Sequence, residues 1–161
     1  RELAHALAGE RLAARKAVLD AAAQSGAGLP QRFALLAMHA DDGALAALCE
    51  RLRVPQECAE LAQLALRQHA KAARADALDA AGLLALLQAV DALRRPERCA
   101  QWLELIELDA PAAQKSVARL RAALQAAQAV DAGAVARQHT DPSAIRDAVA
   151  AARVAAIGAA I

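Results

Sequence analysis

The first group of side chains that could do chemistry in this 161-residue sequence consists of His39 and the acidic pair Asp41 and Asp42, which follows it by two residues. Imidazole and carboxylate groups are common protein ligands of divalent metals, so this group could hold an ion. His39, however, ends an otherwise apolar segment, and an acid beside a turn is well suited to capping the next helix. We therefore favour the capping interpretation over a metal site.

Basic side chains form the second candidate group, which consists of Arg51, Arg53, Lys71, Arg94, Arg95 and Arg98. Arginine matches phosphate with two parallel hydrogen bonds, so these residues could contact a nucleic-acid backbone. They could equally form solvated faces that pair with nearby glutamates. His69, in a basic run that includes Lys71, could likewise face a phosphate, although an exposed position on a helix is the favoured interpretation.

Other reactive residues give little support for catalysis. No serine stands beside a histidine, as nucleophilic catalysis would require. Cys49, Cys58 and Cys99 lack the spacing of a metal or redox motif and are expected to be small core residues. Trp102 shares a helix face with Leu105, so we expect it in the core rather than on a base-stacking surface.

The elements that must position these residues are helices. Hydrophobic residues make up 58% of the sequence and aromatic residues 1%, which favours helix because alanine and leucine have the highest helix propensities. The apolar periodicity predicts an all-α, irregular bundle of seven or eight helices with no sheet, at about residues 2–23, 31–40, 44–52, 55–73, 80–93, 97–108, 112–130 and 143–157. The segment 134–138 is a further short candidate.

No apolar run is long enough to cross a bilayer, and no signal-peptide pattern opens the chain. A cytoplasmic protein without a membrane partner is therefore expected. Because the first residue is arginine rather than methionine, the chain is expected to be a fragment or a processed product.

The stretch from Leu48 to Arg98 organises the sequence. It reads LCERLRVPQECAELAQLALRQHAKAARADALDAAGLLALLQAVDALRRPER, with basic residues before a proline at two places. This stretch resembles the C-terminal body of bacterial CCA-adding tRNA nucleotidyltransferases. Similar landmarks continue on both sides, from Val18-Leu19-Asp20 to Ile145-Arg146, so the resemblance covers nearly the whole chain from about residue 14.

The resemblance implies an enzyme whose N-terminal head adds CMP and AMP to the 3′ end of tRNA, using Mg²⁺, ATP and CTP. Such a head needs a pair of carboxylates for metal ions and a glycine-containing loop for the triphosphate. This sequence has no Asp-x-Asp, and the segment Ser25–Gly28 is better explained as a helix-ending loop. The chain is therefore expected to lack the head, and no cofactor is expected in it.

Some members of the resembled family also carry an HD phosphohydrolase domain, whose histidines and aspartates bind a divalent metal. In this sequence Ala14 stands where the first histidine belongs, and Met38-His39 where the His-Asp pair belongs. His69 and Asp91 match residues of the pattern. With His39, they are weak metal candidates that do not rebuild a site, because a competent site needs three or more supported ligands.

Together these observations predict a degenerate HD-like helical domain at 1–110 and a C-terminal helical segment at 111–161. The expected function is to bind and position tRNA beside a separate catalytic head. One alternative is a helical interaction or dimerisation module that does not bind nucleic acid. Another is a residual metal-dependent phosphohydrolase using His39, His69, Asp91 and either Asp41 or Asp42.

Overall fold

The computed structural model describes residues 10–161, with side chains from residue 14 onward. The first expected helix was placed from residue 2, and that beginning lies outside the described residues. The described part of the chain contains α-helices, two short 3₁₀ helices and no strand, which confirms the all-α prediction. The nine α-helices within residues 10–161 exceed the expected seven or eight, in part because the short candidate at 134–138 does form a helix, α9.

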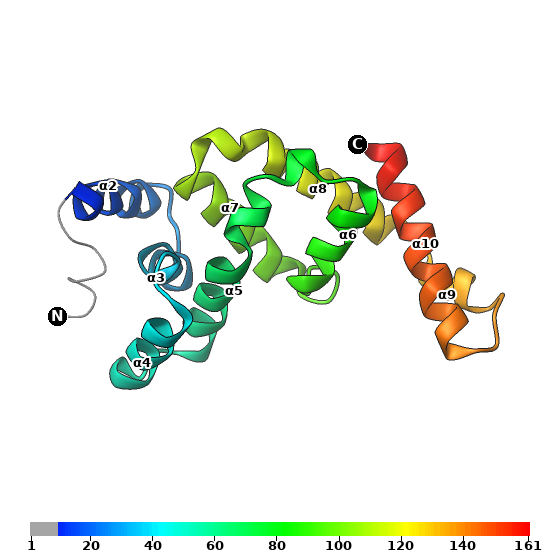
Figure 1. The fold of residues 1–161 in the computed structure, drawn as a ribbon, viewed down its shortest axis with the longest axis horizontal. Helices are drawn as coiled ribbons and strands as arrows, with labels where there is room; N and C mark the ends of the chain where they lie inside the picture. The colour runs from blue at the N-terminus through cyan, green and yellow to red at the C-terminus, as the bar shows by residue number, and fades with distance from the viewer. Residues whose placement is uncertain (1–9) are drawn as a thin grey trace. The chain divides into compact units, whose positions relative to one another are not determined.

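The α-helices in chain order are α2 (Glu10–Gln24), α3 (Leu29–Ala37), α4 (Asp42–Leu52), α5 (Gln56–Ala72), α6 (Ala80–Ala89), α7 (Pro96–Asp109), α8 (Gln114–Ala129), α9 (Ala132–Ala136) and α10 (Pro142–Ala160). The 3₁₀ helices are η1 (Ala75–Ala77) and η2 (Pro111–Ala113). Figure 1 labels the α-helices. The helix starts follow local signals, because most of them coincide with a residue that suits a helix N-terminus.

Aspartate side chains cap four of these helices. Each accepts a hydrogen bond from the backbone N–H three residues later, at distances of 2.7 Å for Asp41, 2.7 Å for Asp79, 2.8 Å for Asp131 and 2.9 Å for Asp141. A cap satisfies one of the donors that a helix start leaves without a partner inside the helix. The capping interpretation of the acidic pair Asp41 and Asp42 is therefore confirmed, with Asp41 as the cap.

The chain forms two compact units. The first contains the described residues up to Ala70 together with Ala100–Ala112, and the second contains Lys71–Cys99 together with Ala113–Ile161. In the first unit α2 packs on α3, and in the second α10 packs along α8, α6 and α9 (Figure 1). The division at residue 110 that the resemblance suggested stays a prediction.

Alanine and leucine make up most of the core. Fully buried alanines alternate with larger side chains in both units, for example at Ala34, Ala62, Ala65, Ala123 and Ala127. A methyl group adds little bulk, so helices that meet at alanines can pack closely. In the first unit α5 contributes such a face, and in the second α8 does.

Candidate functional site

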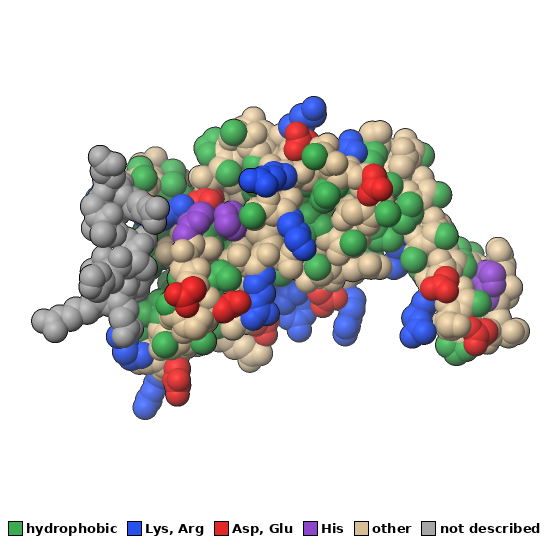
Figure 2. Space-filling model, in the orientation of Figure 1, with side chains coloured by type: hydrophobic (Ala, Val, Ile, Leu, Met, Phe, Trp, Pro, Cys, Tyr) green, Lys and Arg blue, Asp and Glu red, His purple; other side chains and the backbone are tan. Residues whose placement is uncertain are grey.

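A cluster of ionisable side chains occupies the first unit. Arg15 comes from α2, His39 follows α3, His69 lies on α5, and Asp109 is the last residue of α7. His39 and Asp109 are separated by 70 residues in the sequence. We call these four residues the His-Asp cluster. Figure 2 shows histidine side chains side by side on the surface, next to acidic and basic ones.

Asp109 is the centre of the cluster. His39 Nε2 lies 3.2 Å from Oδ1 and 3.1 Å from Oδ2 of this carboxylate. The Arg15 guanidinium donates to Oδ1 of the same carboxylate and reaches the Leu35 carbonyl oxygen at 3.4 Å. An acid at the C-terminus of a helix is unfavourable beside the negative end of the helix dipole. Arg15 and His39 therefore compensate a charge that α7 by itself would disfavour.

His69 completes the cluster. Its ring meets the His39 ring edge to face, with centroids 4.9 Å apart and an angle of 78° between the planes. Its Nδ1 is buried and has no hydrogen-bond partner among the described residues. A buried polar atom without a partner is uncommon in folded proteins. His69 is therefore held in the cluster mainly by packing.

Electrostatics within the cluster favour a charged Asp109 and a neutral His69. Burial of Asp109 opposes its ionisation, but hydrogen bonds from His39 and Arg15 outweigh that effect and hold the pKa of the carboxyl below its ordinary value. Burial lowers the pKa of His69, and the nearby His39 lowers it further, although Asp109 acts in the opposite direction. His69 thus resists gaining a proton.

The sequence placed only part of this cluster. His39 was grouped with Asp41 and Asp42, but Asp41 caps α4, and Asp42 makes an exposed contact with Arg67 at 3.3 Å. Asp109 lies just beyond the helix expected at 97–108 and was not among the candidate residues. An acid at a helix C-terminus is a weak signal, since it shows that a partner is needed but not which one.

Donor atoms of His39, His69 and Asp109 all lie within 4.8 Å of one another. Asp91, the third weak metal candidate, is not part of this group. It lies in the second unit, with its carboxylate 3.8 Å from Arg95. Two imidazoles and a carboxylate could bind a metal by ligand type. The group nevertheless fits a divalent ion poorly, because the Arg15 guanidinium already pairs with Asp109.

Most of the candidate phosphate-binding residues point toward solvent. Arg51, Arg53 and Lys71 are exposed, as are Arg94 and Arg95. Arg98 differs, because it is half-buried and its Nη2 donates to the Val90 carbonyl oxygen at 3.1 Å. These residues belong to both units: Arg51 and Arg53 to the first, and Lys71 and Arg94, Arg95 and Arg98 to the second.

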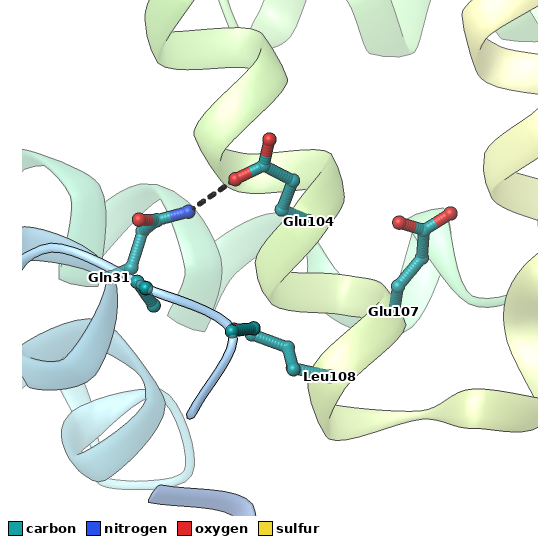
Figure 3. Close-up of a pocket in the computed structure, with 7 residues that line it drawn as sticks. Gln31, Glu104, Glu107 and Leu108 are labelled. Carbon is teal, nitrogen blue, oxygen red and sulfur yellow. Dashed lines mark hydrogen bonds between the residues drawn. The ribbon is translucent and has the colours of Figure 1, made fainter. Parts of the chain in front are cut away.

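A pocket of about 320 Å³ also lies in the first unit, between the loop after α2 and the face of α7. Figure 3 shows Gln31 reaching toward Glu104, to which its Nε2 donates at 2.6 Å. The Gln31 oxygen accepts from the backbone N–H of Gly28 at 3.0 Å. Gln31, which is only 6% exposed, thus fixes the start of α3. Glu104 and Glu107 give the pocket an acidic lining that is unsuited to phosphate.

The remaining reactive side chains are structural. Trp102 is fully buried, which confirms its expected place in the core. Cys58 and Cys99 are buried and Cys49 is half-buried, and all three are free thiols. Burial raises the pKa of Cys99 to about 11, so this thiol is inert at neutral pH. None of the helices within residues 10–161 combines the length and apolar character required to cross a membrane.

Comparison with known proteins finds relatives that share one name. The chain is 41% identical over 171 residues to the multifunctional CCA protein of Cupriavidus necator, a match that covers 89% of this chain and 42% of that protein. It is 40% identical over 173 residues to the multifunctional CCA protein of Burkholderia pseudomallei, covering 89% of this chain and 41% of that protein. The corresponding protein of Paraburkholderia phymatum is 47% identical over 122 residues, which are 71% of this chain and 29% of that protein.

No protein-family model matches the chain. No solved structure matches it either. The chain spans about two fifths of the length of the first two relatives, so the match is to part of a longer protein. The identity of 41% in a match that covers 89% of the chain leads to one conclusion. The chain is homologous to part of the multifunctional CCA proteins.

Proposed function

We propose that this chain is the tRNA-holding helical part of a CCA-adding tRNA nucleotidyltransferase, acting in the cytoplasm beside a separate catalytic head. The observation that carries the proposal is the identity of 40–41% to multifunctional CCA proteins along 89% of the chain. In this proposal the chain contributes affinity and orientation. Nucleotide transfer, with Mg²⁺, ATP and CTP, belongs to the head.

The residues proposed to contact tRNA are Arg51, Arg53, Lys71, Arg94 and Arg95, which are all exposed. Duplex RNA is recognised mostly through its shape and its phosphates, which suits cations on helix ends and turns. Arg98 is proposed as a supporting residue, because its guanidinium donates to a backbone carbonyl in its own unit.

We also propose that the HD-type metal site of the family is lost in this chain. Two features support this. Ala14 stands at the position that resembles the first histidine of the pattern, and Arg15 beside it holds Asp109 by an ion pair. A residual phosphohydrolase would need either Asp41 or Asp42 as a ligand, but Asp41 serves as a helix cap and Asp42 as an exposed partner of Arg67.

The proposal is tested by titrating the purified chain with an unmodified tRNA transcript at several salt concentrations. We expect binding whose logarithm falls linearly with the logarithm of salt concentration, because neutralised phosphates release their counterions. R94A/R95A and R51A/R53A should each weaken binding and reduce the salt slope by about 1 for every phosphate that the variant no longer neutralises.

R137A/R146A is the matched control, since it removes the same charge from exposed positions outside the candidate set. The control should weaken binding less than either test pair. Equal effects of all three pairs would show that only net charge matters and would refute the assignment. No binding by the unaltered chain at low salt, together with a mass that rises with concentration, would favour the interaction module instead.

A further inference from the structure

The Arg15 side chain places a positive charge beside three side chains that could bind a metal ion, those of His39, His69 and Asp109. It is 18% exposed and Asp109 is 7% exposed, so their ion pair is largely shielded from water. Around the same carboxylate, donor atoms of His39 and His69 lie within 4.8 Å of each other and of Asp109. The buried Nδ1 of His69 has no partner within residues 10–161.

Without Arg15, this set would suit a borderline transition metal such as Zn²⁺ or Ni²⁺. Imidazole nitrogen and carboxylate oxygen are their usual ligands, and three protein ligands with an open fourth position are sufficient for zinc. The three residues come from different places in the fold, His39 after α3, His69 from α5 and Asp109 from α7. Their approach is thus a property of the folded unit.

With Arg15 present, a divalent ion meets two obstacles. The guanidinium donates to Asp109 Oδ1, so one oxygen of the only carboxylate in the set is occupied. A divalent ion bound to Asp109 would also lie close to the positive guanidinium in a poorly solvated place, where like charges repel strongly. A guanidinium cannot relieve this repulsion by losing its proton.

We propose that Arg15 is the built-in cation of the His39–His69–Asp109 group and replaces a divalent metal there. The guanidinium links α2 to the end of α7 and to the Leu35 carbonyl of α3, which is the cross-linking that a bound ion provides in a structural metal site. The unit is then metal-independent as it stands. Removal of Arg15 turns the group into a transition-metal site.

The role of Arg15 as a replacement cation does not depend on tRNA binding, and its test uses the full chain without a histidine tag. The unaltered chain, H69Q, R15M and R15M/H69Q are compared by calorimetric titration with Zn²⁺ and by the visible absorption of bound Co²⁺. Methionine fills the space of the arginine stem without its charge. The double variant removes one ligand, so it controls for binding by the thiols and by other histidines.

We expect no saturable binding and no rise in melting temperature with Zn²⁺ for the unaltered chain. R15M should melt at a lower temperature without metal, bind one Zn²⁺ and recover stability on binding. R15M/H69Q should bind at least about tenfold more weakly than R15M, because a ligand is missing.

Two results would overturn the proposal. One is stoichiometric Zn²⁺ binding by the unaltered chain that H69Q abolishes, since the metal would then coexist with Arg15. The other is a folded R15M that binds no metal, because the ligand set would then be incompetent. If R15M does not fold, R15K takes its place. Lysine keeps a cation but cannot span both Asp109 and Leu35 as a planar fork does, so R15K should fold, be less stable and still exclude Zn²⁺.

Discussion

Arg98 donates a hydrogen bond from Nη2 to the carbonyl oxygen of Val90, 3.1 Å away, and Val90 is the residue that ends α6. Carbonyl groups at a helix C-terminus lack partners within the helix, and a nearby cation also interacts favourably with the helix dipole. The arginine cluster at residues 94–98 therefore contains one half-buried structural member and two exposed ones.

Replacing Arg98 by alanine should lower the free energy of unfolding by about 1–2 kcal/mol, since the variant lacks a charged hydrogen-bond donor at a partly buried position. R94A removes the same charge from an exposed position and should change stability by less than about 0.5 kcal/mol. Urea denaturation of both variants measures the difference. Equal stabilities would show that the hydrogen bond to Val90 is not a support for α6.

Arg53 adopts a left-handed backbone conformation, with φ of 49°, directly after α4. This conformation is strained for a residue with a Cβ but not for glycine. R53G should therefore raise the free energy of unfolding by about 0.5–1 kcal/mol, after the greater freedom of glycine in the unfolded chain is subtracted. R53A keeps the Cβ and should be close to neutral in thermal melts, so a gain with alanine as large as that with glycine would exclude backbone strain as the cause.

Ser116 is 2% exposed and connects α8 to η1. Its hydroxyl accepts from the backbone N–H of Asp76 at 3.1 Å and lies 3.0 Å from the Ala73 carbonyl oxygen. S116A should cost about 1–3 kcal/mol of unfolding free energy, because both backbone groups lose their partner in a partly buried place. The exposed S143A is the control and should cost less than about 0.5 kcal/mol in the same denaturation experiment.

The His-Asp cluster predicts the direction of the pH dependence of stability. The pKa of His69 is lowered from its ordinary value of 6.5. As pH falls, His69 therefore takes up its proton at a higher pH in the unfolded chain than in the folded chain. Stability should then decrease as pH falls from 6.5 toward the folded pKa of His69. The pKa of Asp109 is lowered from 3.8, so its contribution is present above that pH and is lost as pH falls through the folded pKa.

Chemical denaturation between about pH 8 and about pH 5 checks this slope. H69Q should flatten the part of the profile just below pH 6.5. D109N should lower stability at neutral pH, since it leaves Arg15 without its charged partner. The cluster would be mis-assigned if stability rose on acidification through this range and the rise disappeared in H69Q.

The order of the helices could be predicted because their ends carry local signals. The helices expected at 97–108 and 143–157 correspond to α7 and α10. Each of these helices begins with a proline, and Asp141 caps α10. The predicted end of α6 was wrong: the helix was expected to continue to Leu93, but it stops at Ala89. Asp91 there has φ of 55°, and Ala92 N–H bonds back to the Leu87 carbonyl oxygen at 2.9 Å. Glycine is the usual residue at a helix end of this kind, so the sequence, which has an aspartate there, gave no signal for the end of α6.

The candidate site was harder to predict because it depends on packing between distant parts of the chain. His39 and His69 were both noticed, but Asp109 is 70 residues from His39 and has no local motif. Arg15 was not noticed either, since a single arginine on an alanine-rich helix has the same local pattern as a solvated one. Only the packing of α2, α3 and α7 brings these charges together.

Because the core is rich in alanine, the fold is sensitive to mutations that enlarge buried side chains. A fully buried alanine such as Ala34 or Ala123 has nothing beyond its Cβ to lose. One base transition, however, converts an alanine codon into one for valine or threonine. Extra atoms in a closely packed interior typically cost about 1–3 kcal/mol. Random mutation should therefore damage this protein mainly by adding atoms to its interior. A survey of tolerated substitutions should find the most deeply buried alanines among the least replaceable positions.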